Sequence, residues 1–329
     1  MKGKKRLLGL FTVFMTVLFL FCSCAPSYHR AEGYAMGAFV SVTAEQGETA
    51  EALLSLVPAL ENEISHKVSS SSIAALNRGE SVTLSDDLLS AISLSLEIQE
   101  KTNGAFSIFL LPLTSLWDFE EGRVPSPSDL LAALREMERA TFTVDGKVAY
   151  LSGGGIDLGA VGKGMAADTL ANALRKKEQN GIVAVGGSIG AVGDKGGKSW
   201  LVGIRDPFSD AQGDTLGTLS LSDAFVSTSG SYEKTFSADG VQYHHILDSK
   251  TGMPVESELI SVTVIADSGI LSDMLSTALF AVGIDAGVAL CAEYGADALF
   301  VQKDGTLLAT RGFAARFSAD GKEVRILET

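Results

Sequence analysis

The spacing of apolar and polar residues predicts a chain that mixes helices with short strands. Segments in which apolar residues recur every three or four positions are expected to be helices, and alternating runs rich in Val, Ile and Phe are expected to be strands. The predicted helices are residues 49–65, 72–77, 86–102, 128–140, 164–177, 271–282 and 286–294. The predicted strands are residues 35–44, 140–144, 148–152, 156–158, 182–185, 200–204, 217–221, 224–227, 243–247, 260–266, 298–301, 307–310 and 324–327.

The order of these segments indicates the fold class. Helices and strands are interspersed without strict alternation, and no Pro- or Ser-rich linker divides the chain. The length of 329 residues allows one large domain or two closely joined ones. We therefore expect an α+β architecture, with mixed sheets flanked by helices in a single compact body of one or two lobes. Within it, Ser85 is expected to cap the helix 86–102.

Composition agrees with a folded protein and reveals a different kind of segment at the N-terminus. Hydrophobic residues make up 46% and charged residues 20% of the chain, which excludes a mostly disordered protein. Met1–Arg6 carries four basic side chains, and Leu7–Phe21 follows as an apolar run. This run is shorter than the roughly 20 residues that a membrane-spanning helix needs. A basic segment followed by a short apolar one is typical of an export signal.

The residues after this run indicate how the segment is processed. Cys24 directly follows a small residue in Phe21-Cys22-Ser23-Cys24, a pattern that resembles a bacterial lipobox. The resemblance implies a lipoprotein signal peptide at 1–23, a lipid on Cys24, a tether at 24–33 and the main domain at 34–329. The protein would then be lipid-anchored to the bacterial cell membrane and face its extracytoplasmic side. An ordinary signal peptide or an uncleaved anchor is the alternative.

Charge and cysteine content exclude several classes of partner. Without residues 1–23 the chain keeps 22 basic and 40 acidic residues, a net charge of −18. Such an acidic body argues against nucleic acid or anionic lipid as a partner held by general electrostatics. Cys291 is the only cysteine beyond the processing site, so neither a disulfide framework nor a cysteine metal site is expected. Cys291 is expected to be a small buried apolar residue.

Two glycine-rich segments are candidates for close approach to a ligand. Asp157–Gly164 ends a predicted strand and opens a predicted helix, where amide donors, the helix dipole and Lys163 would suit a diphosphate. In the alternative interpretation this is a turn whose Asp157 caps the helix. Gly186–Gly190 matches a nucleophile elbow around Ser188, but the following residues 191–199 are rich in Gly and Lys and disfavour the required helix. A tight turn is therefore favoured there.

Polar side chains on two further segments suggest acid–base chemistry and a cation. His244 and His245 are adjacent on a predicted strand and would face opposite sides, so one can point into a site while the other is packed or solvated. Asp273 and Thr277 are four residues apart on one helix face, an oxygen pair that suits Mg²⁺ together with water and a phosphate. Stabilisation of the first helical turn by Asp273 is the alternative.

Nine segments taken in order are similar to the ApbE family, the FAD:protein FMN transferases. They are Met36-Gly37, Ser70–Asn77, Thr102–Ser107 with Pro112-Leu113 and Leu116-Trp117, Asp157–Asp168, Val185–Gly187, Gly203–Pro207, Ser227–Gly230, His245–Pro254 and Asp273–Ala278. The resemblance implies a flavin transferase domain that moves FMN from FAD to a Ser or Thr hydroxyl of a target protein and releases AMP. The implied partners are FAD, an extracytoplasmic flavin-acceptor protein and, through the lipid anchor, the membrane. An FAD pyrophosphatase that gives FMN and AMP, or a non-catalytic flavin-binding lipoprotein, is the alternative.

The resemblance also assigns roles to individual residues. It implies FAD contacts at Met36, Ala105, Phe106, Ser107, Asp157, Lys163 and Ile246, a Mg²⁺ site at the backbone carbonyl of Ala160 with Asp273 and Thr277, and a catalytic base at His245. The chain departs from the family pattern at four places. Ser107 replaces the usual Asp, Ser188 a common Asn, Ala160-Val161-Gly162 the usual Gly-Ile-Ala, and Ser249 a frequent Pro. The residues implied in acid–base, cation and phosphate roles are all present, so activity is expected.

Overall fold

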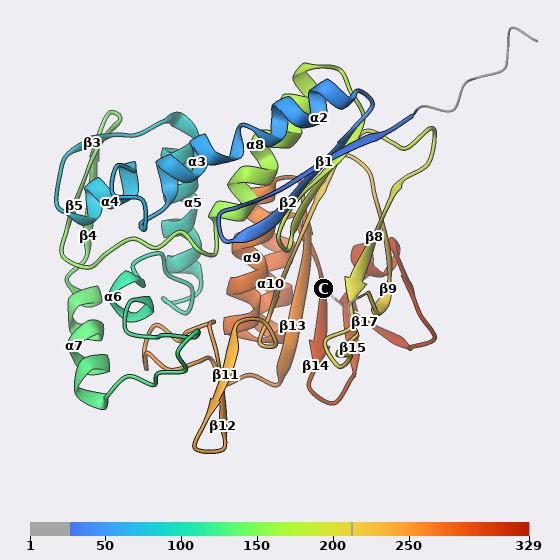
Figure 1. Cartoon of the computed structure of the whole chain (residues 1–329). Helices are drawn as coiled ribbons and strands as arrows, with labels where there is room; N and C mark the ends of the chain where they lie inside the picture. The colour runs from blue at the N-terminus through green and yellow to red at the C-terminus, as the bar shows by residue number, and fades with distance from the viewer. Residues whose placement is uncertain (1–26, 212, 329) are drawn as a thin grey trace, which may run out of the picture.

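The computed structural model describes residues 27–211 and 213–328 as a body of sheets covered by helices (Figure 1). The strands are β1 (His29–Ala35), β2 (Ala38–Ala44), β3 (Val82–Thr83), β4 (Thr141–Asp145), β5 (Val148–Ser152), β6 (Gly181–Val185), β7 (Ser188–Val192), β8 (Trp200–Arg205), β9 (Thr215–Leu221), β10 (Phe225–Gly230), β11 (Thr235–Ala238), β12 (Val241–His244), β13 (Leu259–Ala266), β14 (Asp297–Gln302), β15 (Leu307–Thr310), β16 (Phe317–Ala319) and β17 (Val324–Leu327). The helices are α2 (Gly47–Leu54), α3 (Val57–Ile64), α4 (Ser72–Asn77), α5 (Asp86–Lys101), α6 (Leu111–Thr114), α7 (Pro127–Glu138), α8 (Gly162–Lys176), α9 (Gly269–Val282), α10 (Ile284–Tyr294) and α11 (Arg311–Ala314).

A nine-stranded sheet forms the centre of the fold. Its strand order is β1-β2-β6-β7-β10-β13-β14-β15-β17, and every pair is antiparallel except β15 with β17. Three smaller sheets have the orders β3-β5-β4, β16-β9-β8 and β11-β12. Antiparallel neighbours need only short connections, whereas strictly parallel sheets need helical crossovers. The α+β class with mixed sheets is thereby confirmed.

Helices and a second sheet cover opposite faces of the central sheet. Helices α8 and α9 lie side by side on one face (Figure 1), where apolar residues of β2, β6 and β13 contact them. The sheet β16-β9-β8 and helix α11 pack on the other face through Trp200, Leu219 and Phe313. One hydrophobic cluster runs from Ile73 on α4 to Phe300 on β14, so the part built from α3 to α5 shares its core with the sheet. Helices α6 and α7 pack in a separate cluster with Trp117 and Leu247.

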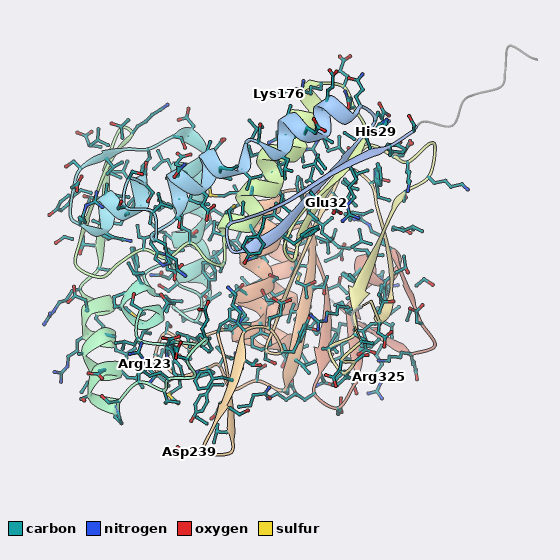
Figure 2. All side chains as sticks on the ribbon, viewed as in Figure 1. His29, Glu32, Arg123, Lys176, Asp239 and Arg325 are labelled. Carbon is teal, nitrogen blue, oxygen red and sulfur yellow. The ribbon has the colours of Figure 1, made fainter. Side chains whose placement is uncertain are left out.

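Charged side chains lie around this core. Glu32, Lys176 and Arg325 are exposed on separate elements of the body, and Asp239 marks the tip of the projecting β11–β12 hairpin (Figure 2). Cys291 on α10 is buried, as expected, and burial raises the pKa of its thiol to about 12. Such a thiol behaves as a small apolar side chain.

Two predicted elements have other bounds in the structure. The predicted strand 35–44 corresponds to β2 and the turn before it, because Met36 and Gly37 both adopt positive φ angles, of 54° and 66°, and reverse the chain between β1 and β2. Two consecutive left-handed residues form the turn that best matches the twist of a hairpin. The predicted helix 49–65 is broken into α2 and α3, with Pro58 in the first turn of α3. Proline lacks the N–H that a continuous helix would need.

Other differences concern short segments. Residues 156–158 form no strand, since the Asp157 N–H donates to the carbonyl of Ile108 in a loop. The predicted strand 243–247 ends at His244 as β12. Elements β1, β3, β7, β11, β16, α6 and α11 were not predicted. Apart from β1, these elements are too short to give a periodic pattern.

The N-terminal predictions lie mostly outside the described residues. The signal peptide at 1–23 and the lipid on Cys24 belong to residues 1–26, which the structure does not describe. Strand β1 begins at His29, within the stretch 24–33 predicted as a tether, so the main domain includes more of the N-terminal segment than expected. Between residues 27 and 328, no helix described is both long enough and apolar enough to cross a membrane.

Candidate active site

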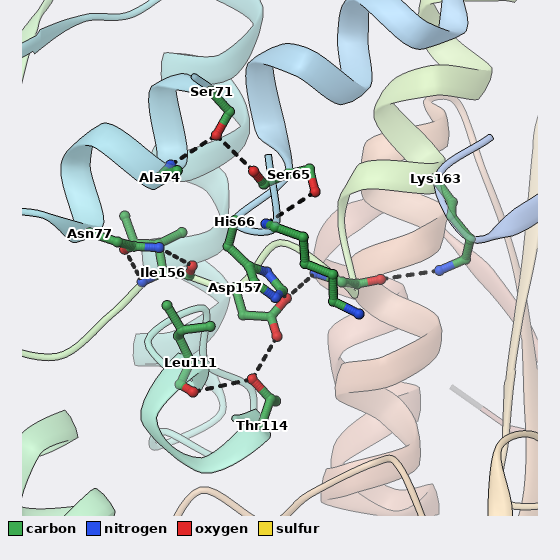
Figure 3. Close-up of polar contacts among 12 residues, drawn as sticks. Ser65, His66, Ser71, Ala74, Asn77, Leu111, Thr114, Ile156, Asp157 and Lys163 are labelled. Atoms are coloured by element: carbon green, nitrogen blue, oxygen red, sulfur yellow. Dashed lines mark hydrogen bonds and ion pairs between the residues drawn. The ribbon is translucent and has the colours of Figure 1, made fainter. Parts of the chain in front are cut away.

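The turn before α8 is organised by the Asp157 carboxylate. Its Oδ1 accepts a 2.9 Å hydrogen bond from the N–H of Gly159, and its Oδ2 accepts one of 2.8 Å from the hydroxyl of Thr114 (Figure 3). His66 approaches the same carboxylate, with its Nδ1 3.5 Å from Oδ1. The residue at the N-cap of α8 is Val161, which makes no side-chain cap. Asp157 therefore holds the turn rather than capping the helix, so that alternative was wrong.

The surroundings of Asp157 favour its ionised form. Burial works in the opposite direction, but the hydrogen bond and charge of His66 together with the donors from Thr114 and Gly159 outweigh it. The pKa of Asp157 is consequently held below its ordinary value. A carboxylate that remains charged in this position is a fixed acceptor for hydrogen-bond donors of a ligand.

Lys163 lies between two parts of the site. Its Nζ donates a 3.1 Å hydrogen bond to the carbonyl of Gly159 and lies 3.7 Å from Oδ1 of Asp273. Its aliphatic stem passes the glycine turn between β6 and β7, where a Cβ added to Gly186 would come within 3.2 Å of its Cδ. The side chain keeps about a third of its surface exposed. A partly exposed ammonium at a helix N-terminus is suited to an anionic ligand.

Asp273 is brought to this place by close packing of α8 on α9. Its Oδ2 accepts a 2.9 Å hydrogen bond from the N–H of Gly164. A Cβ at Gly164 would clash with the carbonyl of Gly269 and would lie 2.7 Å from the Cβ of Asp273. The carboxylate of Asp168 on α8 accepts from the N–H groups of Gly269 and Ile270 and so closes the N-terminus of α9. Two glycines and one carboxylate thus fix the distance between the helices.

The oxygen atoms at this position fit a hard cation. Asp273 is 3% exposed, and Thr277 follows one helical turn later on the same face of α9. Across residues 27–211 and 213–328, no three His, Cys, Asp or Glu side chains form a metal cluster, so a cation here must use other oxygens. Ala160, whose carbonyl is the expected backbone ligand, lies in the turn just before α8. One carboxylate, one hydroxyl and one carbonyl are the donors that Mg²⁺ accepts, with water and phosphate completing the shell.

His245 follows β12 at the base of the β11–β12 hairpin. Its Nδ1 lies 3.0 Å from the carbonyl oxygen of Glu233, which precedes β11. Because a carbonyl only accepts, Nδ1 carries the proton and Nε2 is left as a free acceptor. Burial, with the charges of Lys234 and Lys163, lowers the pKa of His245 to about 4. The imidazole is therefore neutral at neutral pH.

His244 has a different role from its neighbour. Its Nε2 donates to the carbonyl of Val255 at 3.2 Å, and its ring packs edge-on against Phe280. Burial lowers its pKa as well. The prediction that one of the two histidines is packed while the other can serve a site agrees with this arrangement. His244 supports the chain beside Ile246, and His245 keeps an available nitrogen.

The hairpin that carries His245 is anchored by aromatic side chains. Phe236 on β11 stacks on Tyr243 of β12 with ring centroids 5.3 Å apart, and Trp117 lies 5.6 Å from Tyr243. The indole N–H of Trp117 donates to the carbonyl of Gly252. These contacts are with the segment after α6, so they hold the base of the hairpin against the body of the protein.

The other residues implied in flavin contact lie in turns and loops of the structure. Met36 lies at the β1–β2 turn, with its Cε 3.3 Å from where a Cβ of Gly162 would be. Phe106 and Ile246 are buried in one hydrophobic cluster, and Ala105 lies in the loop after α5. Ser107 Oγ accepts a 3.1 Å hydrogen bond from the N–H of Phe109. Ser107 thus stabilises its own loop, which is a task that the family's usual Asp could also perform.

Further contacts bring these loops together. The hydroxyl of Ser249, four residues after His245, donates to the carbonyl of Gly104. The N–H of Asp157 donates to the carbonyl of Ile108 at 2.8 Å. The loop containing Ala105–Ser107 is therefore joined both to the segment of His245 and to the turn of Asp157. Lys163 and Asp273 complete the group at the N-terminus of α8.

Ser188 does not belong to a nucleophile elbow. It opens β7 instead of a helix, it is fully buried, and its Oγ has no hydrogen-bond partner among the described residues. The preceding Gly186 has a φ of +56° and forms the β6–β7 turn. The tight turn favoured from the sequence is confirmed.

Sequence reasoning missed the two side chains that hold Asp157. Thr114 and His66 are 43 and 91 positions away from it along the chain. No motif in the sequence points to His66, and Thr114 lies on the unpredicted helix α6. The available signal was weak, because a lone His or Thr is more often packed or solvated than part of a site.

Comparison with known proteins places the chain in a family. The model of the ApbE family matches residues 36–300. The FAD:protein FMN transferase of Treponema pallidum is 34% identical over 298 residues, which cover 83% of this chain and 82% of that protein. The FAD:protein FMN transferase of Klebsiella pneumoniae is 32% identical over 245 residues, which cover 72% and 76%. The crystal structure of the ApbE protein of Thermotoga maritima matches with a TM-score of 0.80 at 30% identity and covers 89% of this chain and 100% of that one. This chain therefore belongs to the ApbE family.

Proposed function

We propose that this protein transfers FMN from FAD to a Ser or Thr hydroxyl of an acceptor protein and releases AMP. The observation that carries this proposal is the state of His245. Its Nδ1 proton is committed to the carbonyl of Glu233, and its Nε2 is free and unprotonated at neutral pH. A neutral imidazole of this kind can take the proton of an attacking hydroxyl.

The surroundings of α8 support binding of a diphosphate. The helix N-terminus offers backbone N–H groups, and Lys163 adds a full positive charge. Lys163 also contributes to the low pKa of His245, which means that the proposed base and the Lys163 ammonium interact electrostatically. In a chain with a net charge of −14, such local compensation is needed to hold an anionic dinucleotide.

Mg²⁺ is the proposed cofactor. Asp273, Thr277 and the carbonyl of Ala160 would hold it, and when bound it would neutralise charge that develops on the pyrophosphate. Lys163 at 3.7 Å from Asp273 would lie beside the same phosphate groups. The carboxylate of Asp157, which Thr114 and His66 hold in place, would meet hydrogen-bond donors of FAD.

The reaction exchanges one bond to phosphorus for another. The acceptor oxygen forms a bond to the phosphorus of the FMN half, its proton passes to Nε2 of His245, and the bond between that phosphorus and the AMP oxygen breaks. General base catalysis of this kind typically contributes about 10²–10⁴-fold to the rate. The products are an FMN–protein phosphodiester and AMP.

The proposed location follows from the N-terminal sequence. The basic segment, the apolar run and Cys24 support a lipid-anchored protein on the extracytoplasmic side of the bacterial cell membrane, where it would meet its acceptor protein. The net negative charge of the chain argues against nucleic acid as a partner. It supports an acceptor protein that is recognised by local contacts.

The function is tested by incubating purified protein with FAD, Mg²⁺ and a flavin-acceptor domain. Transfer gives a fluorescent acceptor band on a denaturing gel together with AMP in solution. If AMP is formed without a labelled acceptor, water takes the place of the hydroxyl and the protein is an FAD pyrophosphatase. If FAD binds but neither product is formed, it is a flavin-binding protein.

A further inference from the structure

A set of hydroxyl side chains joins β10 to α9 next to the proposed metal ligands. Ser227 and Ser229 lie on the face of β10 that meets α9, because alternate residues of a strand share a face. The Oγ of Ser227 lies 2.8 Å from that of Ser272. The Oγ of Ser229 lies 2.7 Å from that of Ser276 and 2.9 Å from Oγ1 of Thr277. Only the second group includes a proposed metal ligand.

The direction of each proton in this group follows from one contact with a carbonyl. The Oγ of Ser276 lies 2.8 Å from the carbonyl oxygen of Asp273, which can only accept, so Ser276 donates there. A hydroxyl has one proton, so the contact between Ser276 and Ser229 uses the proton of Ser229. Ser229 then accepts the proton of Thr277. The proton of Thr277 therefore points to Ser229, and the lone pairs of the Thr277 oxygen remain available to another group.

We infer that Ser229 is a positioning residue for the cation ligand Thr277. This inference rests on the proposed function, since it takes the Mg²⁺ site as its starting point. A cation attracts lone pairs and repels an O–H hydrogen that points toward it. By accepting the Thr277 proton, Ser229 turns that hydrogen away and presents the lone pairs of Thr277 to the cation. Partners that orient metal ligands typically change metal affinity by about 10–100-fold.

The chain of hydrogen bonds also links the two side-chain ligands. It runs from Thr277 through Ser229 and Ser276 and ends at the main chain of Asp273, one helical turn earlier. Because β10 lies inside the nine-stranded sheet, these hydrogen bonds connect both ligands to a central strand of the sheet. A hydrogen bond from the helix to such a strand restricts the rotation of the Thr277 side chain.

A second pair of serines supplies a matched control. Ser227 on the same strand meets Ser272 on the same helix, and Ser272 donates to the carbonyl of Gly269 as Ser276 does to that of Asp273. Ser227 is fully buried and makes no hydrogen bond to Thr277. Replacing Ser227 by Ala therefore deletes the same chemical group from the same interface without touching the proposed ligand.

The test measures cation binding directly and needs no turnover. Mn²⁺, which accepts the same oxygen ligands, is titrated into purified protein with FAD bound, and free Mn²⁺ is followed by its EPR signal. We expect Ser229→Ala to weaken Mn²⁺ binding by about tenfold, Ser227→Ala to leave it unchanged, and Ser229→Thr, which keeps a hydroxyl, to retain native affinity. In a Thr277→Val background, Ser229→Ala is expected to have no further effect.

Three outcomes would overturn the inference. Native Mn²⁺ affinity in Ser229→Ala would show that Thr277 does not depend on Ser229. Equal weakening by Ser227→Ala would show that the serines act only through packing of the helix. Unchanged Mn²⁺ binding in Thr277→Val would show that Thr277 is not a cation ligand, and would contradict the proposed Mg²⁺ site. Failure of acceptor labelling in a protein that still binds Mn²⁺ with this pattern would instead contradict the proposed function alone.

Discussion

The N–H of Gly164 donates a 2.9 Å hydrogen bond to Oδ2 of Asp273, where α8 and α9 pack closely. This contact joins the glycine-rich turn to the helix that carries the proposed cation ligands. It exists because neither Gly164 nor Gly269 has a Cβ, which would strike the backbone of the opposite helix. The distance between the glycine-rich turn and Asp273 is thus set by two glycines.

Gly164→Ala is expected to destabilise the protein by at least about 1–3 kcal/mol, because the added Cβ overpacks a contact between two backbones. Thermal unfolding measures the loss, and the Mn²⁺ titration measures the displacement of Asp273. Gly269→Ala fills the same contact from the other helix, so the double variant should lose less than the sum of the two. Strict additivity would show that the two glycines do not share one contact.

His245→Gly is expected to lower the rate of acceptor labelling by about 10²–10⁴-fold at saturating FAD. The Kd for FAD should change little, because His245 acts on the hydroxyl proton and not on the ground-state complex. Labelling rates and FAD fluorescence quenching give the two quantities. His244→Gln serves as the neighbouring control and should affect the unfolding temperature more than the rate, since His244 bonds the chain at Val255. Labelling that survives the loss of His245 would contradict the assignment of the base.

The pH dependence of labelling should follow the low pKa of His245. Burial and nearby lysine charges lower that pKa from 6.5 to about 4, so the imidazole stays neutral and active well below pH 6.5. The same shift means that His245 contributes to stability above pH 6.5, and this contribution is lost as the pH falls toward about 4. We expect the labelling rate to stay level between pH 7 and about pH 5, with FAD binding measured in parallel. A midpoint near 6.5 in the rate alone would contradict this environment.

Thr114→Val is expected to raise the Kd for FAD by about tenfold while the labelling rate at saturating FAD changes little. The variant keeps the shape of Thr114 but removes a donor to the Asp157 carboxylate, and hydrogen bonds to charged groups contribute about 1.5–3 kcal/mol. His66→Ala should act in the same direction, whereas His66→Asn, which keeps an N–H donor, should act less. In an Asp157→Asn background neither change should add its full effect, because both act through that carboxylate.

Cys24→Ser is expected to move the protein from the membrane fraction to the soluble extracytoplasmic fraction or to leave its precursor uncleaved. A lipid anchor requires the thiol as its attachment point, and a hydroxyl does not replace it. Fractionation followed by gel mobility measures both outcomes, and Cys22→Ser is the control because Cys22 precedes the predicted cleavage point. Unchanged membrane attachment together with unchanged gel mobility in Cys24→Ser would favour an uncleaved anchor.

Local interactions were well predicted, and non-local ones were not. Ser85 caps α5 through the N–H of Leu88, as its position before the helical pattern predicted. The hairpin at Met36-Gly37 was missed because no polar residue interrupts the segment from Ala35 to Val40, and only the positive φ angles reveal the reversal. The break before Pro58 was missed because the amphipathic pattern of residues 49–65 continues through this proline.

The sequence by itself determined the α+β class, the family resemblance and the chemical groups of the site, because these depend on residue type and on spacing within single elements. Lys163 follows from its place at the start of α8, and the shared face of Asp273 and Thr277 follows from helical geometry. Only the tertiary structure decided which partners fix those groups. Thr114 reaches Asp157, and Ser229 reaches Thr277, across 43 and 48 positions. Such contacts depend on how helices pack on strands, and that packing is a property of the whole core and not of any local pattern.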